Sequence, residues 1–168
     1  MIKQTNEKLN IIKKVKNKKT GEIEEVNVIH KYGCLFMSLL WIAEDFFNKM
    51  YDRVDGFDAA DIKAIYNSAV FKGYMCDDCW VLNHSKIIEL ALQHLGVFTN
   101  AEYLGKIDLI SSQSFGRYDK FNYILKQSKT KNGNGHFYSL NYDPYFDEKK
   151  IFEKKFLYDM SIRLYRVK

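Results

Sequence analysis

The sequence is poor in proline, cysteine and arginine, and it lacks a long apolar run. It has one proline, three cysteines, and four arginines against 22 lysines. A low, odd number of cysteines does not favour a disulfide framework and is typical of the reducing cytosol. The most apolar stretch, residues 35–47, is shorter than the about 20 residues that span a bilayer, and residues 1–19 contain no apolar signal-peptide core. We therefore expect a cytoplasmic protein without a membrane-spanning segment.

What the sequence does contain is enough apolar surface for one folded domain. Of its 168 residues, 46% are hydrophobic and 15% are aromatic, which favours a globule with a real core over a disordered chain. No repeat, linker or low-complexity segment divides the chain. We expect a single domain over residues 1–168, made of a basic amino-terminal hairpin or arm (1–31), a helical half (32–96) and a sheet half (97–168).

The net charge of +5 is concentrated in the first residues of the chain. Residues 1–19 hold seven lysines and one glutamate, while the remainder is nearly neutral. Such a segment can bind nucleic acid or an anionic surface, but lysine runs also keep the edge of an exposed strand soluble. We favour the second interpretation, because the run has no interleaved aromatic residues on which bases could stack.

The periodicity of apolar residues changes from helical to alternating after Gly96. Two charged, weakly alternating segments around Gly21 predict a hairpin, and Asp58 and Asn83 are typical caps at the start of helices. Helices followed by a mostly antiparallel sheet give the α+β class. The expected hairpin strands are Leu9–Val15 and Ile23–Ile29, the expected helices are 59–71 and 84–95, and the expected later strands are Ala101–Leu104, Phe121–Lys126, His136–Leu140 and Ser161–Val167.

Residues 32–49, YGCLFMSLLWIAEDFFNK, predict a central helix about which the fold is built. A helix that is apolar on nearly every side is buried all round, and we expect the core positions to be Phe36, Leu39, Leu40 and Ala43. Cys34 follows a glycine in the first turn, where backbone N–H groups lower a thiol pKa and favour the thiolate. This position fits a nucleophile, although cysteine is also common as a small buried residue.

A thiol nucleophile needs an imidazole as its base and a third group that orients the imidazole. If a tight hairpin turns at Ser139–Leu140, His136 lies opposite Asp143 with Cβ atoms about 5 Å apart. A four-residue loop, Tyr138–Asn141, gives the same pairing without requiring a type I′ turn. If the strand instead continues straight, Asp143 lies about 23 Å away, and Asn141, or no residue, orients the histidine.

These segments resemble the papain-like cysteine peptidases of the bacteriocin-processing type. The resemblance is carried by GC at the start of a buried helix, a late strand beginning GHF, and YDP after it. More narrowly, YGCLFMSLLWIAE and HFYSLNYDPY resemble an uncharacterised family found on spirochaete plasmids and in prophages. The resemblance covers roughly residues 32–166. It implies a papain-like fold and an amide- or peptide-bond hydrolase acting on a peptide or protein, with Cys34 as nucleophile, His136 as base and Asp143 as orienter.

The sequence departs from those peptidases at the oxyanion-binding position. They carry a glutamine about six residues before the cysteine, and Val28 stands there in this chain. The nearby polar residues are Asn27 and His30, which are our candidates for the missing donor. Because loss of one oxyanion donor costs about 100- to 1,000-fold in rate, the alternative is a catalytically inactive plasmid- or phage-encoded protein that uses the same scaffold for binding.

A second cysteine motif, Cys76-Asp-Asp-Cys79, is followed by His84 and His94. A C-x-x-C pair suits zinc or a redox disulfide, but the spacing to the histidines is not that of a standard zinc finger. The two histidines are about 15 Å apart along the predicted helix, so they cannot easily serve one metal. We expect no metal and no other cofactor.

Overall fold

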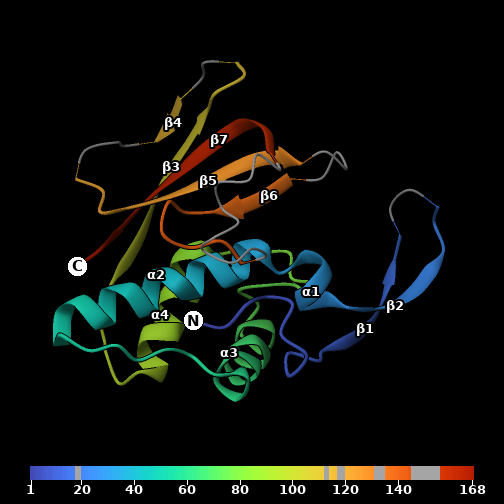
Figure 1. Cartoon of the computed structure of the whole chain (residues 1–168), viewed down its shortest axis with the longest axis horizontal. Helices are drawn as coiled ribbons and strands as arrows, with labels where there is room; N and C mark the ends of the chain where they lie inside the picture. The colour runs from blue at the N-terminus through green and yellow to red at the C-terminus, as the bar shows by residue number, and fades with distance from the viewer. Residues whose placement is uncertain (18–19, 112–113, 117–119, 131–134, 145–155) are drawn as a thin grey trace.

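The computed structural model describes residues 1–17, 20–111, 114–116, 120–130, 135–144 and 156–168, and the chain folds into one helical layer and one sheet layer (Figure 1). This confirms the α+β class. The elements in chain order are β1 (Ile12–Lys16), β2 (Ile23–Asn27), α1 (Val28–Tyr32), α2 (Cys34–Tyr51), α3 (Ala59–Phe71), α4 (His84–His94), β3 (Ala101–Asp108), β4 (Ser114–Gly116), β5 (Tyr123–Thr130), β6 (Gly135–Tyr138) and β7 (Phe156–Val167).

In the described residues the sheet layer has five strands in the order β4-β3-β7-β5-β6, and neighbouring strands run antiparallel. Helices α2 and α4 pack against each other, α2 contacts β6, and α4 contacts β3. The hairpin β1–β2 forms a separate two-stranded sheet that projects from one end of the molecule beside α1 (Figure 1). The sheet and the helices therefore meet along α2, with β6 at the edge of the sheet.

Helix α2 is the most buried helix, as its apolar sequence predicts. Phe36, Leu39, Leu40 and Ala43 are all fully buried, and residues 36–40 and 42–44 are buried without a break. Full burial of a phenylalanine or leucine side chain contributes about 1.5–3 kcal/mol to stability. The carboxyl-terminal end of α2 is exposed, so its burial is greatest where the sheet and the other helices cover it.

The polar side chains of α2 have specific partners within this core. The Ser38 hydroxyl donates to the carbonyl of Phe137 in β6 at 3.3 Å. The buried Glu44 carboxylate accepts the backbone N–H of Phe57 at 2.9 Å. Since a buried polar group without a partner costs about 1–3 kcal/mol, these bonds explain how a buried helix tolerates polar residues. The Ser38 bond also joins the helical layer to the strand that carries His136.

The other two predicted helices begin where their caps indicate. The Asp58 side chain accepts hydrogen bonds from the N–H groups of Ala60 and Asp61. The Asp61 carboxylate in turn accepts the Asp58 N–H, which completes a capping box. The Asn83 side chain accepts the N–H of Lys86 at the start of α4. Gly96 follows α4 with a φ of 80°, a conformation that favours glycine.

Two elements were not predicted, and several strand boundaries differ. The segment Val28–Tyr32 forms the short helix α1, where we expected Ile23–Ile29 to continue as a strand, because the Asn27 side chain accepts the His30 N–H and caps a helix there. Strand β4 also lacked a prediction, and β3, β5 and β7 extend beyond the segments expected for them. Within the described residues, no helix combines the length and the apolarity needed to cross a membrane.

Candidate active site

Cys34 is the first residue of α2, and the junction with α1 holds it there. Gly33 separates the two helices, and a Cβ atom at this position would lie 2.6 Å from the carbonyl oxygen of Ile29. Real Cβ atoms do not approach a backbone oxygen so closely, so only glycine fits between the helices in this arrangement. Cys34 is a free, partly exposed thiol, and the first N–H groups of α2 have no partner within their own helix.

His136 lies on β6, at the edge of the sheet that contacts α2. Strand β6 pairs with β5, with His136 opposite Ser128. The bond from Ser38 to the carbonyl of Phe137 fixes the residue next to His136 against α2, one helical turn after Cys34. The ring of Tyr138 lies parallel to the imidazole on the same face of the strand, with centroids 6.3 Å apart. The His136 side chain is therefore held from both layers.

Asp143 and His136 are brought together as a hydrogen-bonded buried pair. His136 Nε2 lies 2.8 Å from Asp143 Oδ1, and both residues are almost completely buried, with 3% and 1% of their surface exposed. A carboxylate in this place fixes the orientation of the imidazole and stabilises its protonated form. The structure therefore brings these two side chains into contact, as the sequence predicts.

The turn that produces this pair differs from the expected hairpin. The N–H of Ser139 donates to the carbonyl of Tyr142 at 2.8 Å, and the Ser139 hydroxyl accepts the N–H groups of Asn141 and Tyr142. The chain therefore reverses at Leu140 and Asn141, so the expected turn at Ser139–Leu140 and the expected four-residue loop Tyr138–Asn141 are both wrong. Strand β6 ends at Tyr138, and Asp143 returns to His136 through a serine-capped turn.

The thiol of Cys34 completes the group. The thiol of Cys34 lies close enough to the imidazole to raise the pKa of His136. Burial lowers the pKa of His136, but the hydrogen bond with Asp143 and the interaction with Cys34 outweigh this effect and raise the pKa to about 9. The arrangement therefore provides a thiol, a base and a carboxylate that orients the base, in that order.

The carboxylate loop is anchored to the helices by residues that the sequence did not single out. Gln4 is fully buried: its N–H donates to the carbonyl of Pro144 at 2.8 Å, and its side-chain amide donates to the carbonyls of Ile29 and His30. Gln4 thus ties the residue after Asp143 to the helix before Cys34. A lone glutamine in a lysine-rich segment carries no sequence signal for such a role, which only the tertiary structure reveals.

An aromatic contact supports the same loop from the other side. The ring of Tyr142 stacks on Trp41 of α2, with centroids 6.0 Å apart and an interplanar angle of 4°. Burial, followed by the charges of Glu44 and Asp143, raises the pKa of the Tyr142 hydroxyl well above its usual value. Tyr142 is therefore a neutral, packed residue, and it places Asp143 against the helix that carries Cys34.

The comparisons with known proteins give one match. The profile of a protein family of unknown function, DUF261, matches residues 13–142. The chain belongs to the DUF261 family. The matched segment includes Cys34 and His136 and ends one residue before Asp143. No curated protein and no solved structure matches the chain.

Asn27 and His30, the candidates for oxyanion binding in this DUF261 chain, both have other partners. The Asn27 amide donates to the carbonyl of Leu9 at 2.7 Å while its oxygen accepts the His30 N–H. Nε2 of the His30 imidazole lies 3.0 Å from the carbonyl oxygen of Asn6. These contacts give Asn27 a clear role in capping α1, and they engage the His30 ring with the backbone of Asn6.

The C-x-x-C motif of this family member does not form a cluster with the two histidines. Cys76 is exposed, Cys79 is buried, and both are free thiols. His84 contacts the hydroxyl of Tyr165, and His94 contacts Asp61. Across the part of the chain that the structure describes, no group of three histidine, cysteine or acidic side chains could hold a metal ion.

Proposed function

We propose that the chain is a thiol-dependent hydrolase or transferase that acts on an amide or peptide bond, with Cys34, His136 and Asp143 as its catalytic residues. The observation that carries the proposal is the buried hydrogen bond between His136 and Asp143, formed close enough to Cys34 for the thiol to raise the pKa of His136. The His136 pKa of about 9 means that the imidazole holds a proton at neutral pH. A protonated imidazole beside the thiol stabilises the thiolate, which is the nucleophilic form of cysteine.

The reaction follows from these positions. The Cys34 thiolate attacks the substrate carbonyl carbon, so that a C–S bond forms while negative charge develops on the carbonyl oxygen. The His136 imidazolium then gives its proton to the amide nitrogen, the C–N bond breaks, and a thioester remains on Cys34. Water attacks the thioester with His136 as its base, and the acid product and the free thiol are released. Asp143 keeps the imidazole oriented throughout.

The oxyanion would be stabilised by backbone groups. The Cys34 N–H, at the start of an 18-residue helix, is a donor beside the thiol, and the dipole of α2 adds partial positive charge there. Val28, at the position where papain-like peptidases carry glutamine, is fully buried, and its apolar side chain has no donor. We therefore expect slower turnover than an enzyme with a second, side-chain donor.

The papain-like assignment is part of this proposal. Its support is the resemblance of the GC and HF…DP segments and the packing of the Cys34 helix against the strand that carries His136. The free state of all three cysteines supports a reducing compartment such as the cytosol, and a peptide or protein is the expected substrate.

A second candidate is a catalytically inactive binding protein on the same scaffold, and Val28 is the observation that favours it. A nucleic-acid role for the basic amino-terminal segment is not favoured. In the hairpin, Nζ of Lys14 lies 3.8 Å from a carboxylate oxygen of Glu25. Nζ of Lys31, in α1, lies 2.6 Å from a carboxylate oxygen of Glu24 in β2. The lysines therefore face a strand of opposite charge, which weakens their field toward phosphates.

The test is the rate at which Cys34 is alkylated by iodoacetamide as a function of pH, in protein carrying Cys76→Ser. A thiolate–imidazolium pair alkylates readily at pH 6, and His136→Ala should slow this reaction by at least about tenfold. Release of p-nitrophenol from p-nitrophenyl acetate should show a burst that Cys34→Ala abolishes. If Cys34 stays inert below pH 8, or His136→Ala leaves the profile unchanged, the binding-protein alternative becomes the better one.

A further inference from the structure

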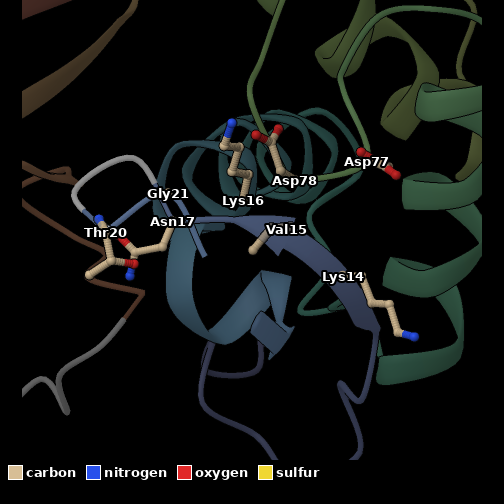
Figure 2. A pocket seen from close by; sticks show the side chains of 8 residues that line it. All are labelled: Lys14, Val15, Lys16, Asn17, Thr20, Gly21, Asp77 and Asp78. Atoms are coloured by element: carbon tan, nitrogen blue, oxygen red, sulfur yellow. Dashed lines mark hydrogen bonds between the residues drawn. The ribbon is translucent and has the colours of Figure 1, made fainter. Parts of the chain in front are cut away.

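A cavity of about 730 Å³ lies between the projecting hairpin and the loop that follows α3 (Figure 2). One wall is formed by the consecutive residues Lys14, Val15 and Lys16 of β1, and the other by Asp77 and Asp78. Figure 2 shows the backbone of β1 running along the cavity and the two aspartates on its opposite side. The cavity thus has a basic wall made by a strand and an acidic wall made by a loop.

The cavity opens along the edge of β1 rather than on one of its faces. Successive side chains of a strand point to opposite faces, so a space lined by three consecutive residues must follow the edge. In the described part of the chain, β1 pairs with β2 alone. The edge of β1 that faces away from β2 therefore offers its backbone groups to the cavity.

The hydrogen bonds at the two ends of the hairpin show which residues offer those groups. The N–H of Val28 donates to the carbonyl of Ile11 at 3.0 Å, and the N–H of Asn17 donates to the carbonyl of Glu22 at 2.8 Å. Hydrogen-bonded pairs alternate along an antiparallel ladder, so odd-numbered residues of β1 bond to β2. The N–H and C=O groups of Lys14 and Lys16 therefore point outward, toward the unpaired edge.

This edge is connected to the proposed active site from both walls. Strand β2 continues through Asn27 directly into α1, which ends at Gly33 beside Cys34. Asp78 immediately precedes Cys79, a buried thiol whose pKa is raised first by burial and then by the charges of Asp78 and of Cys34. Both walls of the cavity therefore belong to segments that continue toward the start of α2 or lie near it.

We propose that this cavity binds an extended segment of a peptide substrate, which adds to β1 as a third strand and places a lysine or arginine side chain against Asp77 and Asp78. The inference rests on the proposed function and assigns its substrate class. Backbone hydrogen bonds to a free strand edge give affinity, and the opposing wall gives specificity. Lys14 already has Glu25 within 3.8 Å, whereas no described cation forms an ion pair with either aspartate. With the Lys14–Glu25 pair set aside, the described lining holds one lysine, Lys16, against the two aspartates, so its net charge is −1.

The experiment uses pentapeptide chloromethyl ketones that carry lysine, glutamine or glutamate at one position at a time, with Cys76→Ser protein. The measured quantity is the second-order rate of Cys34 labelling, with iodoacetamide as a probe that needs no peptide site. At the position that faces the aspartates, lysine should exceed glutamate by about three- to tenfold, the range for two exposed ion pairs. Asp77→Asn with Asp78→Asn should remove this preference, while Asp52→Asn, at the far end of α2, should preserve it.

The strand edge is tested by a matched pair of substitutions. Lys14→Pro removes an N–H that points away from β2, which an edge strand tolerates, and it should slow every peptide probe by about fivefold, the value of one hydrogen bond. Lys14→Ala keeps this N–H and should label peptides at the original rate. Both variants should react with iodoacetamide as the parent does, and urea unfolding checks that the hairpin substitution leaves the fold intact.

The outcomes separate this inference from the proposed function. Equal labelling by lysine, glutamine and glutamate probes at every position, or equal rates for Lys14→Pro and Lys14→Ala, would overturn the cavity assignment even if Cys34 proves reactive. If iodoacetamide labelling proves independent of His136, only the proposed function fails. The same peptides, carrying fluorescein in place of the electrophile, then test the cavity by fluorescence anisotropy with Cys34→Ala protein, where a lysine preference that depends on Asp77 and Asp78 would support it.

Discussion

Replacement of Asp143 by asparagine tests the electrostatic core of the proposed site. The substitution keeps the shape of the side chain and removes the charge that lies 2.8 Å from His136 Nε2. Burial lowers the pKa of His136, but the hydrogen bond to Asp143 and the interaction with Cys34 raise it from 6.5 to about 9. A rise of this size corresponds to about 3 kcal/mol in favour of the protonated imidazole. Without the carboxylate, burial still disfavours the protonated imidazole, but the main interaction that stabilises it is gone. We therefore expect the pKa of His136 to fall by about 2 units.

The sign of the effect on stability follows from the raised pKa. A histidine whose pKa is higher in the folded state stabilises the fold fully below its unfolded pKa of 6.5, and this contribution is lost as the pH rises through about 9. The free energy of unfolding of Asp143→Asn should therefore lie below that of the parent by up to about 3 kcal/mol at pH 6. The difference should shrink toward zero by pH 10.

The assay combines NMR titration of the His136 ring protons with urea unfolding at pH 6 and pH 10. Asp159→Asn is the matched control, because Asp159 accepts hydrogen bonds from Ser128 and Tyr138 on the neighbouring strands and makes no described contact with His136. The same measurements on Cys34→Ala give the contribution of the thiol to the raised pKa of His136. The reasoning is refuted if His136 still titrates near pH 9 in Asp143→Asn, or if the loss of stability is the same at both pH values.

Three further predictions concern the surroundings of the site. Gly33→Ala should destabilise the protein by about 1–3 kcal/mol in urea unfolding, because the added Cβ would lie 2.6 Å from the Ile29 carbonyl; an unchanged midpoint would show that the junction adjusts freely. Burial lowers the pKa of His84 to about 4, so up to about 3 kcal/mol of stability should be lost as the pH falls from 6.5 toward 4. In His84→Gln, the free energy of unfolding measured in urea should depend less on pH over this range. Protein purified without added metal should contain no stoichiometric zinc at Cys76 and Cys79 by elemental analysis.

The helices were predictable because their signals are local. Asp58 and Asn83 cap their helices through N–H groups two or three residues away, and the apolar run after Cys34 identifies the buried helix without reference to the rest of the chain. Helix α1 escaped prediction because it is five residues long, and its cap, Asn27, also ends a strand. A helix of this length is stabilised by its tertiary contacts rather than by its own sequence.

The candidate site was predictable in its members but not in its supports. His136 and Asp143 are seven residues apart, so any tight turn between them can bring their side chains together. The turn itself depends on the Ser139 hydroxyl, which captures two backbone N–H groups and moves the reversal away from the hairpin expected from strand pairing. Gln4 bonds to residues 25 to 140 positions away, and no local pattern encodes contacts of that range.

The place of β6 at the edge of the sheet has a consequence for how activity would be lost. This strand has four residues and, in the described part of the chain, one neighbouring strand, and the Ser38 hydroxyl donates to the carbonyl of Phe137 in it. Short edge segments open locally at a lower free energy than the core around them. Opening of β6 would carry His136 away from Cys34 while α2 and the central strands stay folded. On heating, the thiol would then lose its base before the molecule loses its fold, and the rate of Cys34 alkylation would report the detachment of a single strand.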